Sequence, residues 1–306
     1  MYFPYLRGKQ FELEALIELP TSVFINTLPI LEPINVSQRR LYSRLANQGT
    51  PFILVTNPFY PQNSRLTNAA VQSLIDTELL THPSLNLGFI IDQRFNVSEL
   101  NSFLTSNPTR NKILIFRYNV LPSDLAAIQA SISANPVLYI VFDDRRTNNT
   151  TRTAFNSHQG QVLLTDGFQR QDRNFDYPAV STFDSNYATW QADGWAGIGD
   201  YLTIGDYYQD GGGPVFVVCL HITVPTVNGL LMYHFSSTVH SSTGGLSAPK
   251  FSEANSILVN SPFTLPFATN GIDIYRDIYN RSHNPQLGVA KKASIMHHIE
   301  LMSGLI

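Results

Sequence analysis

Charged and amide side chains follow a series of short apolar runs in this sequence. Glu32 ends the run Leu28-Pro-Ile-Leu, and Asp143 ends the run Val137-Leu-Tyr-Ile-Val-Phe. Because each run is followed by a polar residue in the same relative position, we expect these side chains to form one site. The complete set is Arg7, Glu32, Asn57, Asp92, Arg117, Asp143, Asp166 and Asp200, with Lys9 one step further out.

These residue types indicate phosphate chemistry assisted by a metal. Clustered carboxylates repel one another unless they share a cation or a proton, and we expect that cation to be Mg²⁺ or Mn²⁺. The predicted metal ligands are Glu32, Asp92 and Asp166, and these three together with Asp143 are the predicted catalytic residues. The predicted substrate-binding residues are Arg7, Lys9, Arg117, Asn57 and Asp200. Such a site suits hydrolysis of a phosphate-containing substrate, for example a nucleotide or a nucleic acid.

Two alternatives stay open at this point. Polar residues end strands in every α/β protein, where they cap the next helix or bind turn amides. The functional interpretation is strongest for Glu32, which lies between apolar residues and Pro33. The alternative to an enzyme is a non-catalytic binding or scaffold component that acts with a protein partner.

The apolar runs themselves predict the fold. Each is short and continuous, as expected of a strand that is buried on both faces. They begin near residues 2, 28, 52, 87, 113, 137 and 161, with helical patterns between them, and an eighth candidate covers 196–202. Eight strands that alternate with helices predict a (β/α)8 TIM-like barrel, which needs about 250 residues.

The alternative architecture is an open, doubly wound α/β sheet. Such sheets often carry a glycine-rich phosphate loop, but Gly197-Ile-Gly199 has Leu202 where the third glycine should be. A Walker loop is also missing from the sequence. We therefore favour the barrel and expect no nucleotide or organic cofactor.

The rest of the chain is expected to elaborate a single barrel domain over residues 1–306. Residues 205–250 should hold a β-hairpin after the eighth strand, with arms at 215–224 and 230–236, followed by a flexible loop at 237–249. This loop is rich in Ser, Thr and Gly, so we expect a mobile lid or docking loop. A C-terminal helix is expected within 281–303.

The cysteine and the histidines offer a weaker second pattern. Cys219 is the only cysteine, and its apolar surroundings favour a small buried hydrophobe. His221 and His234 lie on opposite arms of the predicted hairpin, where pairing of the arms would bring their rings together. We interpret them as a structural pair. His298 falls on the apolar stripe of the last helix. His297 shares a line with Glu300 at i, i+3, a spacing that can bind metal but is also common on solvated faces.

Composition limits the class of protein. Charged residues make up 14% of the 306 residues and the net charge is −3, so there is no global basic field of the kind that binds nucleic acid or membranes. No apolar run approaches the roughly 20 residues of a membrane span. The N-terminus lacks the pattern of a signal peptide, and we expect a cytoplasmic protein.

Five segments resemble one known family. They are Met1-Tyr-Phe-Pro-Tyr-Leu-Arg-Gly-Lys-Gln-Phe-Glu-Leu with Leu28-Pro-Ile-Leu-Glu-Pro-Ile34, then Gly197-Ile-Gly-Asp-Tyr201, and last Asn284-Pro285 with Ala293-Ser-Ile-Met-His-His-Ile299. Together they resemble the beta family of phage- and mobile-island-associated bacterial proteins. The resemblance implies a phage- or defence-related setting and a second protein encoded nearby as partner. It supplies no catalytic assignment.

Overall fold

The computed structural model describes residues 1–306 except 61–65, 209–213, 239–246 and 284. These residues pack as two compact units, each with its own core. The barrel unit comprises 1–13, 26–165 and 190–200, and the hairpin unit comprises 14–25, 166–189 and 201–306. The expected single domain over the whole chain stays a prediction.

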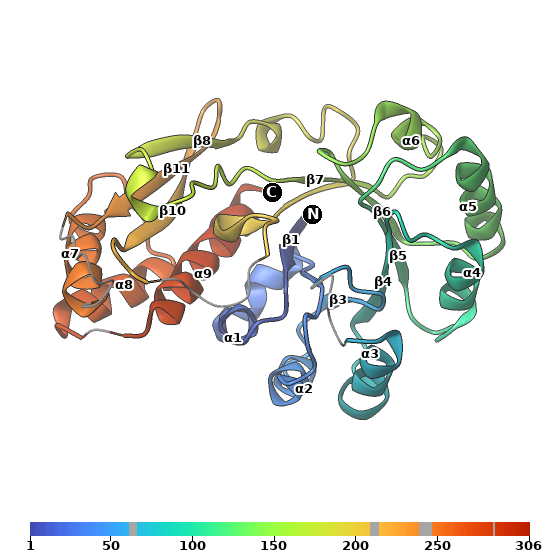
Figure 1. Cartoon of the computed structure of the whole chain (residues 1–306), viewed down its shortest axis with the longest axis horizontal. Helices are drawn as coiled ribbons and strands as arrows, with labels where there is room; N and C mark the ends of the chain where they lie inside the picture. Colours follow the sequence, from blue (N-terminus) through green and yellow to red (C-terminus); the bar gives the residue numbers. More distant parts are fainter. Residues whose placement is uncertain (61–65, 209–213, 239–246, 284) are drawn as a thin grey trace. The chain divides into compact units, whose positions relative to one another are not determined.

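Eight parallel strands close into a barrel, in the order β1-β2-β3-β4-β5-β6-β7-β9, which confirms the predicted (β/α)8 architecture (Figure 1). Nearly every residue of these strands is buried, as continuous apolar runs require. The strands are β1 Tyr2–Leu6, β2 Ile30–Leu31, β3 Phe52–Val55, β4 Leu85–Ile91, β5 Lys112–Phe116, β6 Tyr139–Asp143, β7 Gln161–Thr165 and β9 Gly197–Asp200.

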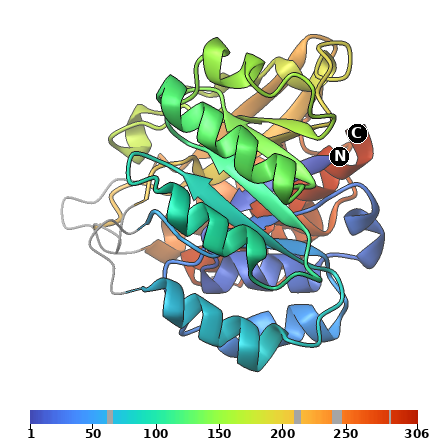
Figure 2. The same ribbon diagram turned by 90° about the vertical axis from the view of Figure 1, so that its right-hand side faces the viewer.

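Helices follow most of the barrel strands. α4 and α5 pack side by side on the outside of the barrel, as Figure 2 shows. Between α3 and the next strand, a short π-helical segment covers Ile75–Leu79. The helices are α1 Gln10–Glu18, α2 Arg39–Asn47, α3 Asn68–Leu74, α4 Val97–Thr105, α5 Pro122–Ala134 and α6 Asn149–Thr153.

The strand register decides which side chains enter the barrel. Paired residues on neighbouring parallel strands project to the same face, and the faces alternate along each strand. Phe3 pairs with Gly199, and a Cβ atom built on Gly197 would lie 2.5 Å from the Phe3 ring. The two glycines of β9 therefore make room for Phe3 inside the barrel. This is a packing role and explains glycines that do not belong to a phosphate loop.

The hairpin unit contains a small antiparallel sheet in the order β10-β11-β8. β10 covers Cys219–Thr226 and β11 covers Gly229–Ser236, which places the predicted hairpin within a few residues of its expected arms. The sequence did not predict the third strand, β8 (Val180–Asp184). Only one of its residues is buried, so its pattern is that of a polar edge strand.

Three helices pack with this sheet: α7 Ser247–Val259, α8 Asn270–Asn280 and α9 Leu287–Leu305. α9 confirms the expected C-terminal helix, but α7 and α8 were not predicted. The expected flexible loop at 237–249 overlaps the first residues of α7, and its residues 239–246 lie outside the described part of the chain. The predicted lid is therefore untested. Every helix in the described part is too short or too polar to cross a bilayer.

Candidate functional site

Glu32 lies at the carboxyl end of the barrel, directly after β2. Its backbone amide continues the ladder by donating to the Leu6 carbonyl at 2.9 Å, and its side chain is completely buried. One carboxylate oxygen accepts the backbone amides of Phe59 at 2.6 Å and Tyr60 at 3.0 Å. Glu32 is therefore a buried carboxylate with four hydrogen-bond donors around it, and the functional role that the sequence suggests for it stays a prediction.

The other oxygen of Glu32 meets the positive groups. It accepts a hydrogen bond from the Tyr5 hydroxyl at 2.9 Å and another from the Arg7 guanidinium. Arg117 Nη1 lies 3.5 Å from the same oxygen. Both arginines are almost completely buried, which is tolerable only because the carboxylate is next to them.

Asp143 extends the same network from the end of β6. Arg117 Nε lies 3.6 Å from its carboxylate, and Arg146 Nε lies 3.2 Å from it. Arg146 is 37% exposed, so the network reaches from the barrel interior to solvent. We call Arg7, Glu32, Arg117, Asp143 and Arg146 the arginine cluster.

Aromatic rings surround the two buried guanidinium groups. Arg7 lies 5.0 Å from the centre of the Tyr5 ring and 4.8 Å from that of Tyr60. Arg117 lies between 5.6 and 5.7 Å from the rings of Tyr5, Phe59 and Tyr60. Such contacts favour a cation over the ring face, and they hold the planar groups in fixed orientations.

Asp92 and Asn57, also at strand ends, are engaged in separate local contacts. Both Asp92 carboxylate oxygens accept hydrogen bonds from the Arg94 side chain, at 2.5 to 3.1 Å. Asn57 accepts the Ile90 amide at 2.8 Å and donates to the Ile90 carbonyl at 2.9 Å, which ties β3 to β4. These contacts give Asn57 a structural role, whereas the sequence interpretation placed it among the substrate-binding residues.

Asp200 was placed with the site by sequence, but the register directs it elsewhere. It pairs with Pro4, one residue beyond the Phe3–Gly199 pair, so it projects to the outer face of the barrel. There it accepts a hydrogen bond from the Tyr2 hydroxyl at 2.8 Å. For a role inside the barrel, the Asp200 side chain would have to project to the opposite face of the strand.

Lys9 and Asp166 complete the predicted set. Lys9 begins α1, since its carbonyl accepts the amides of Glu12 and Leu13 at 3.0 Å. Asp166 belongs to the hairpin unit, where it accepts the backbone amides of Phe168 and Asp206 at 3.2 Å. Within its own unit, the Asp166 carboxylate thus stabilises a turn.

The predicted Mg²⁺ or Mn²⁺ site therefore stays a prediction. Arginine side chains contact both Glu32 and Asp92 at the positions where a cation was expected. Within the described residues, the one group of three side chains that could hold a metal ion is Cys219, His221 and His234. These residues belong to the hairpin unit, and their ligand atoms all lie within 4.8 Å of one another.

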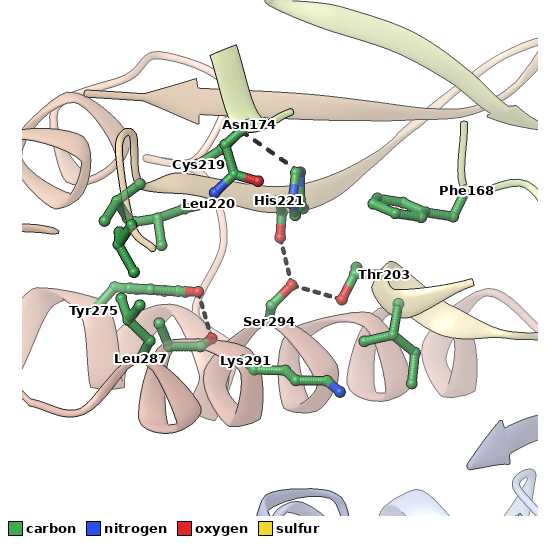
Figure 3. Close-up of a pocket in the computed structure, with 14 residues that line it drawn as sticks. Phe168, Asn174, Thr203, Cys219, Leu220, His221, Tyr275, Leu287, Lys291 and Ser294 are labelled. Carbon is green, nitrogen blue, oxygen red and sulfur yellow. Dashed lines mark hydrogen bonds between the residues drawn. The ribbon is translucent and has the colours of Figure 1, made fainter. Parts of the chain in front are cut away.

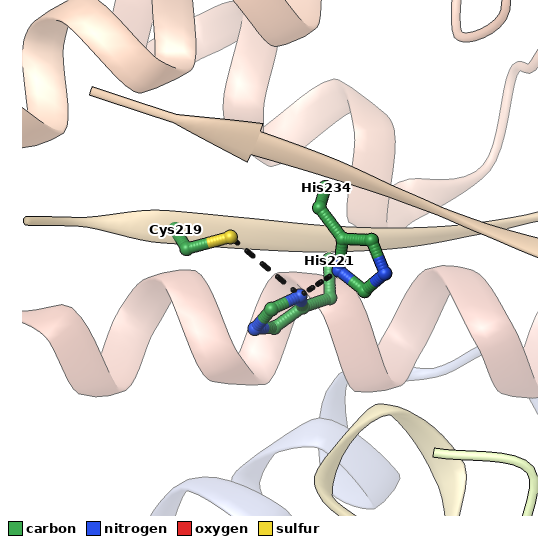
Figure 4. Close-up of side chains that lie close together, drawn as sticks. All are labelled: Cys219, His221 and His234. Carbon is green, nitrogen blue, oxygen red and sulfur yellow. Dashed lines mark hydrogen bonds between the residues drawn. The ribbon is translucent and has the colours of Figure 1, made fainter. Parts of the chain in front are cut away.

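Strand pairing assembles this second cluster, which Figure 4 shows. Cys219 and His221 are two residues apart on β10 and share a face, and His234 is the cross-strand partner of His221 on β11. His221 Nδ1 lies 2.8 Å from His234 Nδ1 and 3.9 Å from Cys219 Sγ. The sequence predicts that the two histidines approach each other, but it indicates only a packing role for Cys219.

All three groups are in their neutral forms near pH 7. Burial lowers the pKa of His221 to about 3, with a further contribution from His234, and burial lowers the pKa of His234 to about 4. Burial also raises the pKa of the Cys219 thiol to about 11. Neutral imidazoles are the form that binds metals.

A cavity of about 300 Å³ adjoins this cluster within the hairpin unit. Cys219 and His221 line it, and Figure 3 shows Ser294 between His221 and Thr203. The Ser294 hydroxyl bonds to the Thr203 hydroxyl at 2.8 Å and to the His221 carbonyl. Asn174 and Lys291 add polar groups to a lining that is otherwise largely apolar.

The last two histidines have structural roles. Both are completely buried in α9. His298 Nδ1 bonds to the Thr223 hydroxyl at 2.7 Å, and the two ring nitrogens of His297 bond to the Thr269 hydroxyl and the Thr223 carbonyl at 2.8 Å. The expected structural role of His298 agrees with these contacts, whereas the solvated position considered for His297 was wrong.

No protein-family model matches the sequence, and no curated protein matches it either. The function is therefore inferred from the geometry of the arginine cluster and of the cluster of Cys219, His221 and His234.

Proposed function

We propose that the carboxyl end of the barrel binds an anionic, phosphate-bearing ligand, with Arg117 as its main contact. The observation that supports this proposal is the arginine cluster itself. Its three guanidinium groups outnumber its two carboxylates, so its formal charge is 3 − 2 = +1. In barrels of this kind the ligand site lies at the carboxyl ends of the strands.

Arg117 is suited to the role by its position and its geometry. Its side chain is 2% exposed, and it lies between Glu32 and Asp143 at 3.5 and 3.6 Å. Both distances exceed the 2.7 to 2.9 Å that is typical of a strong charge-assisted hydrogen bond. A phosphate in front of Arg117 would gain close bidentate contacts from the planar guanidinium.

Glu32 acts in this proposal as a positioning residue. Its two oxygens already accept hydrogen bonds from two backbone amides, a tyrosine and Arg7. A carboxylate that is engaged in this way is poorly placed to act as a base or to exchange ligands with a metal. It fixes Arg7 and Arg117 at the end of the barrel before any ligand arrives.

This proposal refines the two hypotheses from the sequence. Hydrolysis of a phosphate-containing substrate with Mg²⁺ or Mn²⁺ needs carboxylates that can reach a cation, and arginines contact Glu32 and Asp92. Recognition of a phosphate group needs only the arginines. A non-catalytic binding component therefore agrees better with the geometry. A protein partner, and the phage- or defence-related setting that the resemblance to the beta family implies, stay part of the proposal.

Binding of simple phosphates tests the proposal. Inorganic phosphate, pyrophosphate and nucleoside monophosphates are titrated into the full chain at low ionic strength and followed by calorimetry. Arg117→Lys keeps the charge but removes the planar fork, and we expect it to weaken binding by about tenfold, or 1.4 kcal/mol. Arg40→Gln, which removes an exposed guanidinium from α2, should bind as the wild type does.

Two outcomes would remove the proposal. One is a wild-type protein that binds none of these phosphates at millimolar concentration. The other is equal affinity in the Arg117→Lys and Arg40→Gln variants. If Arg117→Lys does not fold, Arg146→Gln serves instead, because Arg146 is partly exposed and contacts the same carboxylate.

A further inference from the structure

We propose that Cys219, His221 and His234 form a Zn²⁺ site with one exchangeable coordination position that faces the cavity of the hairpin unit. The inference does not depend on the anion site, because all three residues belong to the other unit. The ligand set is one sulfur and two imidazole nitrogens. Such a set favours zinc over Mg²⁺ or Mn²⁺, which prefer oxygen ligands.

The distances are close to those of tetrahedral zinc. With Zn–N near 2.0 Å and Zn–S near 2.3 Å, tetrahedral geometry puts two nitrogens about 3.3 Å apart and nitrogen and sulfur about 3.5 Å apart. The corresponding separations here are 2.8 Å between the two Nδ1 atoms and 3.9 Å between His221 Nδ1 and Cys219 Sγ. A metal ion would separate the imidazoles by about half an ångström and draw the sulfur toward His221 by about 0.4 Å. The third separation, between Cys219 Sγ and the His234 nitrogen, lies within 4.8 Å.

The contact between the two imidazoles also indicates that a metal ion would replace the proton they share. Two neutral Nδ1 atoms at 2.8 Å share one proton, so one ring donates to the other. For both nitrogens to bind a cation, each ring must carry its proton on Nε2. His234 Nε2 lies 2.9 Å from the Ser181 hydroxyl, which can accept that proton and so stabilise the metal-binding tautomer.

Aromatic side chains hold the two rings in place. Tyr177 stacks on His234 at 4.8 Å between ring centres and meets His221 edge-on at 4.7 Å. Phe168 also contacts His221, edge-on, with the ring centres 5.2 Å apart. Rings that are fixed by packing require little rearrangement when a ligand binds.

Charge and proton balance fit a metal better than a reactive thiol. Without a metal, burial keeps the Cys219 thiol protonated, which disfavours a free nucleophile. When Zn²⁺ binds, the S–H bond breaks, the zinc–sulfur bond forms and the proton leaves to solvent. The buried site then carries 2 − 1 = +1 charge, since both imidazoles are neutral.

The fourth coordination position follows from the lining of the cavity. Cys219 and His221 both line it, as do Asn174, Ser294 and Lys291. Three protein ligands with an open fourth position are typical of zinc sites that act on a bound molecule. A water molecule or a small anion would complete the coordination from this cavity.

Cobalt substitution of the chelator-treated full chain tests the site. One equivalent of Co²⁺ should produce a thiolate charge-transfer band and the intense visible bands of tetrahedral coordination, and Zn²⁺ should abolish both. Cys219→Ser should lose the charge-transfer band, whereas His283→Asn, which removes an exposed imidazole, should keep it. Ser181→Ala should weaken metal binding by about tenfold through loss of the second hydrogen bond. Azide should shift the visible bands if the fourth position is exchangeable.

The single cysteine gives a readout on the unmodified protein. Cys219 is the only thiol in the chain, so its alkylation rate reports on this site alone. Zn²⁺ should slow alkylation of the wild type by about tenfold or more, and it should have no such effect on His221→Asn. Wild-type protein that shows no cobalt–thiolate band and unchanged alkylation with excess Zn²⁺ would overturn the proposal. Binding without an azide response would overturn the exchangeable position.

Discussion

Replacement of Glu32 by Gln is the sharpest perturbation of the barrel end. The change keeps the shape of the side chain, but it replaces one carboxylate oxygen by an NH₂ group and removes the negative charge. Oε1 of Glu32 accepts the amides of Phe59 and Tyr60, and Oε2 accepts Tyr5 and Arg7 with Arg117 close by. In either orientation, the NH₂ group of Gln therefore faces at least two hydrogen-bond donors, and it cannot accept a hydrogen bond from them.

The magnitude follows from the burial of the partners. Arg7 and Arg117 are 4% and 5% exposed, so they cannot turn to water when the charge is removed. Removal of one member of a buried ion pair typically costs about 3 to 5 kcal/mol, because it leaves an uncompensated charge behind. We expect Glu32→Gln to lower the free energy of unfolding by this amount, with a fall in Tm of roughly 10 °C.

Urea unfolding of the two proteins measures the difference. Glu99→Gln is the matched control, because Glu99 is exposed on α4 of the same unit, and we expect it to change stability by about 0.5 kcal/mol or less. A Glu32→Gln protein that is as stable as the control would refute the argument that Glu32 neutralises buried arginines. A Tm that rises with Mg²⁺ or Mn²⁺ in the wild type, but not in Glu32→Gln, would instead restore Glu32 as a metal ligand.

Two more predictions concern the rest of the fold. The pKa values of His221 and His234 are lowered to about 3 and 4, so the unfolded state takes up protons first as the pH falls below the ordinary value of about 6.5. The free energy of unfolding of the metal-free protein should therefore fall by about 2 kcal/mol for each histidine between pH 7 and pH 5, as followed by urea midpoints, and a level profile would contradict the burial argument. Gly197→Ala should cost about 1 to 3 kcal/mol, because its Cβ would lie 2.5 Å from the Phe3 ring. Gly304→Ala has no heavy atom within 4 Å of the new Cβ and should leave the urea midpoint unchanged or slightly higher, so equal effects at the two glycines would be evidence against the packing role.

The barrel was predictable because its strands are continuous apolar runs of similar length at regular intervals. The elements that were missed lack that pattern. β8 reads Val-Ser-Thr-Phe-Asp and buries only Phe183, and α7 has Pro249 in its first turn and buries the polar residues Lys250 and Asn255. Their positions depend on tertiary contacts that a local pattern does not carry.

The candidate site was predictable only in part, because it also depends on tertiary contacts that a local sequence pattern does not carry. The sequence locates the ends of strands, but strand register decides which face a side chain enters, and a shift of one residue reverses it. Asp200 was misplaced in this way. The partners of the carboxylates, Arg94 and Arg146, come from the loops after β4 and β6, where sequence spacing does not fix side-chain direction.

The composition of the chain gives a reason to assign a function to the arginine cluster. Charged residues are only 14% of the sequence, yet Arg7, Glu32, Arg117 and Asp143 are all at most 5% exposed at one end of the barrel. Well-packed apolar residues in place of a buried ion pair are often neutral or stabilising, so stability alone does not account for four buried charges. Recognition of a charged ligand does account for the four buried charges, because apolar replacements would remove the binding of that ligand. An apolar replacement of all four residues that preserved both the stability and the phosphate affinity of the protein would contradict this reasoning.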